Sequence, residues 1–156
     1  MPSPLALEDR VVDLLGAGVA LVVGTANEAR EPEVCRGWGG LWKAESGVLE
    51  VMLPLPAARS TLDNLARTDA VAFTFTKPTD YEAYQLKGAR LEIRELRAEE
   101  WRRVRRQFDA FLAEASCVGL DPAAYAPWFP AEGRLLAARI EAAFSQAPGP
   151  KAGLAL

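Results

Sequence analysis

The chain contains no histidine, and this absence removes several kinds of chemistry at once. Ser-His and Cys-His nucleophile systems need an imidazole base, and histidine is also the commonest metal ligand in proteins. The two cysteines, Cys35 and Cys117, lack the spacing of a metal site or of a CxxC motif. No metal site is therefore predicted, and catalysis would have to rely on a bound cofactor that the protein positions.

Other absences limit the location and the partners of the protein. No apolar run approaches the roughly 20 residues that a membrane span requires, and the N-terminus lacks the basic and apolar regions of a signal peptide. Two cysteines in a chain of 156 residues suggest reduced thiols rather than a disulfide framework. These features predict a cytoplasmic protein that does not associate with membranes.

The charge distribution argues against a nucleic-acid surface. The net charge is -3, and no basic block with interleaved aromatic residues is present. The basic run from Arg102 to Arg106 lies among acidic residues, which is typical of a solvated helix face.

The pattern of elements predicts one domain over residues 1–156. Early strands joined by short turns favour a mainly β chain with flanking helices (α+β), whose antiparallel sheet curls into a barrel. Ser3 and Pro4 suit the start of the first helix. We predict an N-terminal helix over 1–17, barrel strands over 18–95 with a short helix at 60–67, a helix over 99–118, a closing strand over 135–144 and an extended tail over 145–156.

The segment from Leu135 to Phe144 has an ambiguous pattern. Its alanine content favours a helix, whereas its apolar residues alternate with Arg139 and Glu141, which favours a strand. We predict a strand.

The segment from Val34 to Lys43 predicts a strand that contains three glycines. Uninterrupted alternation would put Arg36, Trp38 and Trp42 on one face. The glycines indicate either strong coiling at a barrel corner or a close approach by a ligand. The two tryptophans suit either stacking on a ligand or packing in a core.

A second strand, from Tyr84 to Glu95, changes the phase of its apolar pattern at Gly88. A one-residue phase change at a glycine is the mark of a β-bulge. The pattern leaves Gln85 and Lys87 together on one face. These two side chains suit a polar ring edge or a phosphate, and equally a solvated barrel exterior.

The segment around Ser60 predicts the start of a short helix, where free N–H groups and the helix dipole favour a phosphate. The alternative is a plain N-cap, because Ser60 and Asp63 have the spacing of a capping box. Arg36 and Arg59 suit a phosphate by paired hydrogen bonds, and each is also compatible with a solvated surface position.

These segments, in this order, resemble the FMN-binding split β-barrel family related to pyridoxamine 5'-phosphate oxidase. Its motifs are roughly S-[RK]-K-x-x-N-L, a following N-P-x-V-A strand and a Q-x-x-G strand. The matching residues in this chain are Arg59, Ser60, Asn64 and Leu65, then Ala70 to Phe73, then Gln85 to Gly88. The ending from Ala142 to Gly153, AAFSQAPGPKAG, is similar to the QTPGPxAG ending of one branch.

The resemblance implies a homodimeric flavoprotein with two FMN sites at its interface. It implies an oxidoreductase that acts on an unknown small molecule or electron acceptor. The implied FMN-binding residues are Arg36, Arg59, Ser60, Thr61, Asn64, Gln85 and Lys87. The resemblance allows the last two to come from the other subunit.

The chain differs from the family in two respects. Thr61 stands where many members have lysine, and the C-terminal Arg-x-His pattern of the true oxidase is absent. We therefore expect a function other than pyridoxamine phosphate oxidation. Thr61 and Asp63 reduce the positive potential at the phosphate seat, which favours an alternative: a non-catalytic module that binds FMN or another planar or phosphorylated ligand.

Overall fold

The computed structural model describes residues 3–156 of the chain. Within that range the elements are, in order, α1 (Asp9–Gly16), β1 (Ala20–Ala26), β2 (Pro32–Lys43), β3 (Val48–Leu55), α2 (Arg59–Leu65), β4 (Ala70–Thr76), β5 (Ala83–Arg94), α3 (Ala98–Cys117), α4 (Pro122–Tyr125), η1 (Ala126–Trp128) and β6 (Glu132–Ser145).

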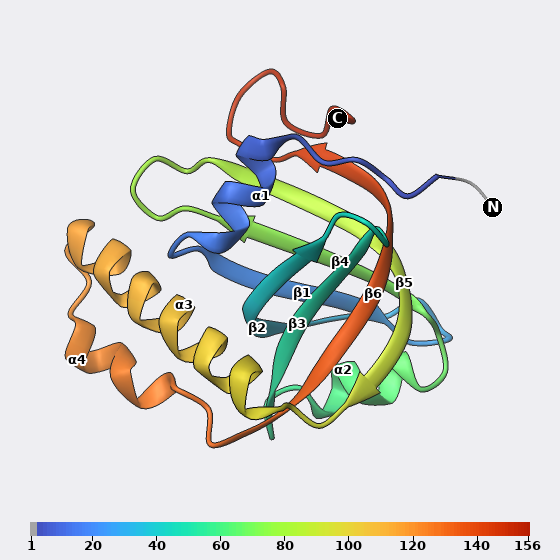
Figure 1. Ribbon diagram of the computed structural model, residues 1–156, viewed down its shortest axis with the longest axis horizontal. Coiled ribbons are helices and arrows are strands. Elements are labelled where there is room, and N and C mark those ends of the chain that lie inside the picture. The colour runs from blue at the N-terminus through green and yellow to red at the C-terminus, as the bar shows by residue number, and fades with distance from the viewer. Residues whose placement is uncertain (1–2) are drawn as a thin grey trace.

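The strands close into one barrel in the spatial order β1-β2-β3-β6-β5-β4 (Figure 1). Every neighbouring pair is antiparallel, which confirms the predicted antiparallel barrel with flanking helices. Strand β6 pairs with β3 along one edge and with β5 along the other, so it closes the barrel. The strand predicted from Leu135 to Phe144 is therefore confirmed, and it extends further at both ends.

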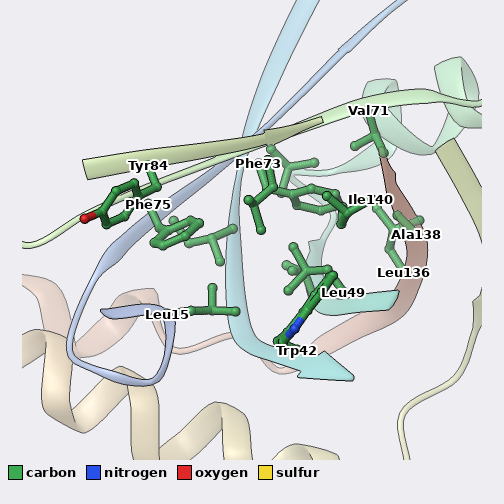
Figure 2. Packing of buried hydrophobic residues seen from close by; sticks show 14 of the residues in the cluster. Leu15, Trp42, Leu49, Val71, Phe73, Phe75, Tyr84, Leu136, Ala138 and Ile140 are labelled. Atoms are coloured by element: carbon green, nitrogen blue, oxygen red, sulfur yellow. The ribbon is translucent and has the colours of Figure 1, made fainter. Parts of the chain in front are cut away.

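The barrel interior is filled by apolar side chains, and Figure 2 shows Val71, Phe73 and Phe75, at alternate positions of β4, among them. Phe73 and Phe75 of β4 and Leu136 of β6 are each fully buried. Burying one such side chain contributes about 1.5–3 kcal/mol relative to leaving it exposed. This apolar interior leaves the outer face of the barrel as the surface for polar chemistry.

Trp38 and Trp42 lie on opposite sides of β2, so the predicted shared face is wrong. The pairing of β2 with β3 shifts register between Trp38 and Leu41, and Gly39 has a left-handed φ of +67°. This bulge reverses the alternation of the strand. Trp42 joins the barrel interior, whereas Trp38 packs outside against Phe108 of α3, with ring centroids 4.8 Å apart. Both tryptophans are core residues.

Helix α3 is tied to this bulge by two side chains. Arg103 Nε donates to the Gly39 carbonyl oxygen and Gln107 Nε2 donates to the Gly40 carbonyl oxygen, each at 2.8 Å. The carbonyl groups that the bulge removes from regular pairing thereby regain partners, as buried polar groups require.

The N-terminal helix begins later than predicted. It starts at Asp9 with Glu8 as its N-cap, so Ser3 is not the cap. The apolar residues that pack on the barrel, from Val11 to Leu15, all lie after that point. Pro4 instead lies beside Gly47 in the turn between β2 and β3. Residues 1–2 of the predicted helix lie outside the described residues.

The C-terminal tail folds back on β6, so the predicted extended tail is wrong. Phe144 forms a bridge with Ala155, and the Leu156 N–H donates to the Ala143 carbonyl oxygen at 2.9 Å. The positive φ angles of Gly149 and Gly153 allow the intervening turns. The tail thus pairs with the last residues of β6, beyond the part of that strand that pairs with β3.

Candidate functional site

The register of the barrel joins two of the predicted site residues in one row on its outer face. Each member of the row follows and precedes inward-pointing residues of its own strand, so its side chain points outward. From β2 through β1, β4 and β5 to β6, the row is Arg36, Val22, Thr74, Gln85 and Phe144.

The adjacent outward row is built mainly from small side chains. It consists of Val34, Gly24, Ala72, Lys87 and Ala142. The helices make their main contacts with β1 and β2, and α3 and α4 lie together at one side of the barrel (Figure 1). Within residues 3–156, the outer faces of β4 and β5 therefore have little helix packed on them.

Gln85 and Lys87 lie on this surface, and the bulge predicted at Gly88 is confirmed. The β5–β6 pairing shifts register between Lys87 and Gly88. Gln85 Nε2 donates to Thr74 Oγ1 at 3.0 Å, which fixes the amide across the strands. Lys87 Nζ lies 5.1 Å from the centroid of the Phe144 ring, within cation–π distance.

Arg36 is held between two aromatic rings. Its guanidinium carbon lies 5.8 Å from the Phe111 ring centroid and 5.6 Å from that of Trp128. Burial lowers the pKa of Arg36 from its usual value. Among the described residues no carboxylate lies within ion-pair distance of it. A half-buried cation of this kind can accept an anionic ligand without first breaking an ion pair.

Helix α2 does not begin as its sequence suggests. Ala58 is the N-cap and no side chain caps the helix, so both the Ser60 cap and the capping box to Asp63 are wrong. The fully buried Ala58 donates its N–H to the Pro54 carbonyl oxygen, and this turn sets the start of the helix. Ser60 consequently lies in the first turn.

The exposed start of α2 retains donors for an anion. Arg59 and Ser60 are both exposed. Within residues 3–156, the backbone N–H groups of Ser60 and Thr61 have no backbone acceptor. Such groups are the usual anion contacts at a helix start.

Thr61 and Asn64 instead face the barrel. Asn64 Nδ2 donates to Thr25 Oγ1 at 3.0 Å. Thr61 is fully buried, and its hydroxyl group lies near Cys35. Burial raises the pKa of the Cys35 thiol, and the neighbouring Thr61 hydroxyl partly opposes that rise. Direct contact with a surface ligand is therefore left to Arg59 and Ser60.

Acidic side chains adjoin this helix start. A surface hollow of about 320 Å³ is lined by Ser60 together with Glu31, Glu33 and Asp63. Their negative charges oppose a phosphate. Sequence reasoning found Asp63 but not Glu31 or Glu33, because only the fold brings the β1–β2 hairpin beside α2. It also missed Trp128, which contacts Arg36 from a segment about ninety residues away along the chain.

Three solved structures share this architecture. An F420 reductase is 18% identical, with a TM-score of 0.58, over 84% of this chain and 93% of that one. A putative pyridoxamine 5'-phosphate oxidase from Lactobacillus delbrueckii is 15% identical, with a TM-score of 0.56, over 89% and 93%. An FMN-binding protein from Syntrophomonas wolfei is 13% identical, with a TM-score of 0.52, over 88% and 84%.

At these identities the comparison establishes the fold. The chain has the split-barrel fold found in FMN-binding and pyridoxamine 5'-phosphate oxidase-like proteins, as its sequence motifs predict. No family model matches the sequence, and no curated protein matches it. Among the described residues, none of the helices is both long and apolar enough to span a membrane.

Proposed function

We propose that the protein binds FMN non-covalently on the outer face of the barrel, at an interface between two copies of the chain, and acts as an oxidoreductase. Its substrate is a small molecule or an electron acceptor. The observation that carries this proposal is the outward row that joins Arg36, half-buried beside α3, to Gln85 on the part of the barrel that no helix covers. Bound FMN supplies electron-accepting and hydride-accepting chemistry to a chain that has no histidine.

The surface suits a flat ring. Gly24, Ala72 and Ala142 present little side chain in the row beside Gln85, so a planar group can approach the backbone closely. The Gln85 amide is already oriented by Thr74, and it leaves its carbonyl oxygen for a donor on the ring edge.

The donors available for a phosphate are the Arg59 guanidinium and the hydroxyl and backbone N–H groups of Ser60, because Thr61 is fully buried. They fit a phosphate in type, because guanidinium and backbone N–H groups are its usual partners. Glu31 and Glu33 lower the local potential. We therefore expect weaker phosphate binding than an uncompensated arginine would give.

The dimer follows from the same surface. Val34 is 64% exposed in the small-residue row, and burial of such a side chain favours association. We expect the protein to sediment as a dimer and Val34→Glu to sediment as a monomer with an unchanged circular dichroism spectrum. Val118→Glu, at a similarly exposed position just after α3, is the matched control and should remain a dimer. A monomeric wild-type protein would contradict the shared interface.

Removal of the Arg59 side chain should weaken FMN more than riboflavin, because only FMN carries a phosphate. We expect Arg59→Ala to raise the Kd of FMN by about tenfold, the loss expected for a charge-assisted hydrogen bond, and to leave riboflavin nearly unchanged. Fluorescence titration of both flavins measures this. Arg67→Ala is the control, because Arg67 is an exposed arginine just beyond the other end of α2 and pairs with Glu28.

Two results would refute parts of this proposal. Equal weakening of both flavins would place Arg59 away from the phosphate. Wild-type protein that neither shows flavin absorbance as purified nor binds added FMN would refute the flavin assignment itself.

The acidic residues beside Ser60 support a second candidate, a binding module without catalytic activity. Such a module would hold FMN or another planar ligand on the same face. Bound FMN that no nicotinamide donor reduces would favour this candidate, whereas reduction would favour the oxidoreductase. Titration with F420 tests a different cofactor on the same surface.

A further inference from the structure

A hollow of about 450 Å³ lies where α1, the bulge of β2 and α3 meet, away from the outward row of Arg36 and Gln85. Pockets that bind small molecules usually have volumes of about 300–1,000 Å³. The residues that line the hollow are Val12, Leu15, Gly16, Gly40, Leu41, Trp42, Arg103, Arg106 and Gln107.

The lining has two chemically different parts. Val12 and Leu15 of α1, with Leu41 and Trp42 of β2, form an apolar part. The side chains from α3 form a polar part that carries two guanidinium groups and no carboxylate. A ligand that fills this hollow would therefore combine an apolar body with a negative charge.

The two arginines differ in how many of their N–H groups already have an acceptor. Arg103 donates from Nε to the Gly39 carbonyl oxygen and from Nη2 to Glu50 at 3.5 Å. Its Nη1 has no acceptor within the described part of the chain. Arg106 is exposed and forms no ion pair or side-chain hydrogen bond with any residue from 3 to 156.

The surrounding charges do not neutralise this pair. Arg103 and Arg106 are three positions apart on α3, where like charges repel. Glu50 and Glu100 are the carboxylates near Arg103. Lys43 and Arg94 lie within ion-pair distance of Glu50, and Arg94 also pairs with Glu100. The outer face of the basic run behaves as the sequence predicts, because Arg105 pairs with Asp109 on the surface. Within residues 3–156, Arg106 is thus the guanidinium of the hollow that has no carboxylate partner.

We propose that this hollow is a binding site for a small amphipathic carboxylate. Paired N–H groups of a guanidinium match the two oxygens of a carboxylate. Within residues 3–156, all the guanidinium N–H groups of Arg106 lack an acceptor. The apolar body lies against Leu15 and Trp42. The site shares no residue with the proposed flavin surface, so refuting one proposal would not refute the other.

Octanoate is the probe, and octylamine is the control with the same chain and the opposite charge. Calorimetry on the full-length protein should show one octanoate site per chain with a Kd on the order of 1 mM or tighter, and no site for octylamine. Amide NMR shifts should centre on Gly16 and Gly40, with a shift of the Trp42 indole N–H. Absence of octanoate binding, equal binding of both probes, or shifts elsewhere would overturn the proposal.

Two variants test the two parts of the lining. Arg106→Gln should weaken octanoate by about tenfold, because it removes the guanidinium charge and leaves a shorter, neutral polar side chain. Gly16→Leu should abolish binding, since a Cβ at Gly16 meets no atom within 4 Å and the larger side chain enters the hollow.

The matched control is Arg102→Gln, an exposed arginine of α3 that does not line the hollow. It should bind octanoate as the wild type does. The circular dichroism spectrum of Gly16→Leu should also be unchanged, which shows that the variant is folded. Unchanged octanoate affinity in Arg106→Gln or in Gly16→Leu would exclude this hollow as the site.

Discussion

Replacement of Gly88 by alanine should lower the free energy of unfolding by about 3 kcal/mol, the upper end for forcing atoms into a packed interior. A Cβ at this position would overlap the carbonyl oxygen of Arg139 on β6 and come within 2.9 Å of the Ile140 Cα. Both are backbone atoms, so no side-chain rotation relieves the overlap. The strand pair that closes the barrel would have to separate at this point.

The measurement is urea unfolding followed by tryptophan fluorescence. Gly16→Ala is the matched control, because a Cβ there meets nothing within 4 Å and its φ is not in the left-handed region. We expect that variant to be as stable as the wild type or up to about 1 kcal/mol more stable, since alanine restricts the unfolded chain. Equal stabilities of Gly88→Ala and Gly16→Ala would show that the paired strands β5 and β6 accommodate a Cβ at position 88.

The same substitution should affect the candidate site. Gly88 follows Lys87 directly, and the register shift between them sets which way Gln85 and Lys87 point. Loss of the bulge would move at least one of them off the outward face, because a one-residue slip inverts a strand. The folded fraction of Gly88→Ala should therefore bind FMN more weakly than the wild type does.

The bulge at Gly88 could be read from the sequence because its signal is local. The apolar phase of β5 changes on either side of one glycine, and both halves lie in one strand. The alternation of β6 was equally informative, since Arg139 and Glu141 interrupt an apolar run at a period of two. In both strands the alternation of apolar and polar residues indicates which face is buried.

The residue pattern of β2 does not indicate its bulge. Trp38 and Trp42 are four positions apart, which in an unbroken strand means one face. Both are apolar and both are buried, but Trp42 lies inside the barrel and Trp38 lies outside it, under α3. Gly39 supplies the left-handed turn between them, and a glycine alone does not show that the strand changes phase.

The candidate site depended even more on the tertiary structure. Arg36 and Gln85 were each recognisable as polar residues on strands. Their common row exists only because β1 and β4 pair in a register that connects them. Glu31 and Glu33 are separated from Ser60 by more than twenty residues of sequence, so their effect on its charge environment was not predictable.

A second large effect is expected at Glu100, a carboxylate in the first turn of α3 that is only 3% exposed. Arg94 binds it through two hydrogen bonds, of 2.9 and 2.6 Å. The backbone N–H of Arg97 donates to it at 2.7 Å. These interactions hold the helix start against the end of β5.

Glu100→Gln should lower the free energy of unfolding by about 3 kcal/mol at pH 7, because the Arg94 guanidinium loses its closest counter-charge and keeps only longer contacts with Glu50 and Glu92. Glu99→Gln is the matched control, since Glu99 is exposed in the same turn. Its effect should be within about 0.5 kcal/mol. Urea unfolding of both variants measures the difference.

The pH dependence tests the same interaction without relying on the variant alone. The hydrogen bonds from Arg94, with those from the Arg97 backbone, lower the pKa of Glu100 from 4.5 to about 2. A carboxylate whose pKa is lower in the folded state stabilises the protein fully above about pH 4.5 and progressively less as the pH falls toward 2. The shift corresponds to about 3 kcal/mol. Wild-type stability should therefore fall more steeply over this range than that of Glu100→Gln, whose amide does not titrate. Parallel curves for the two proteins would show that the Glu100 carboxylate has an ordinary pKa in the folded state.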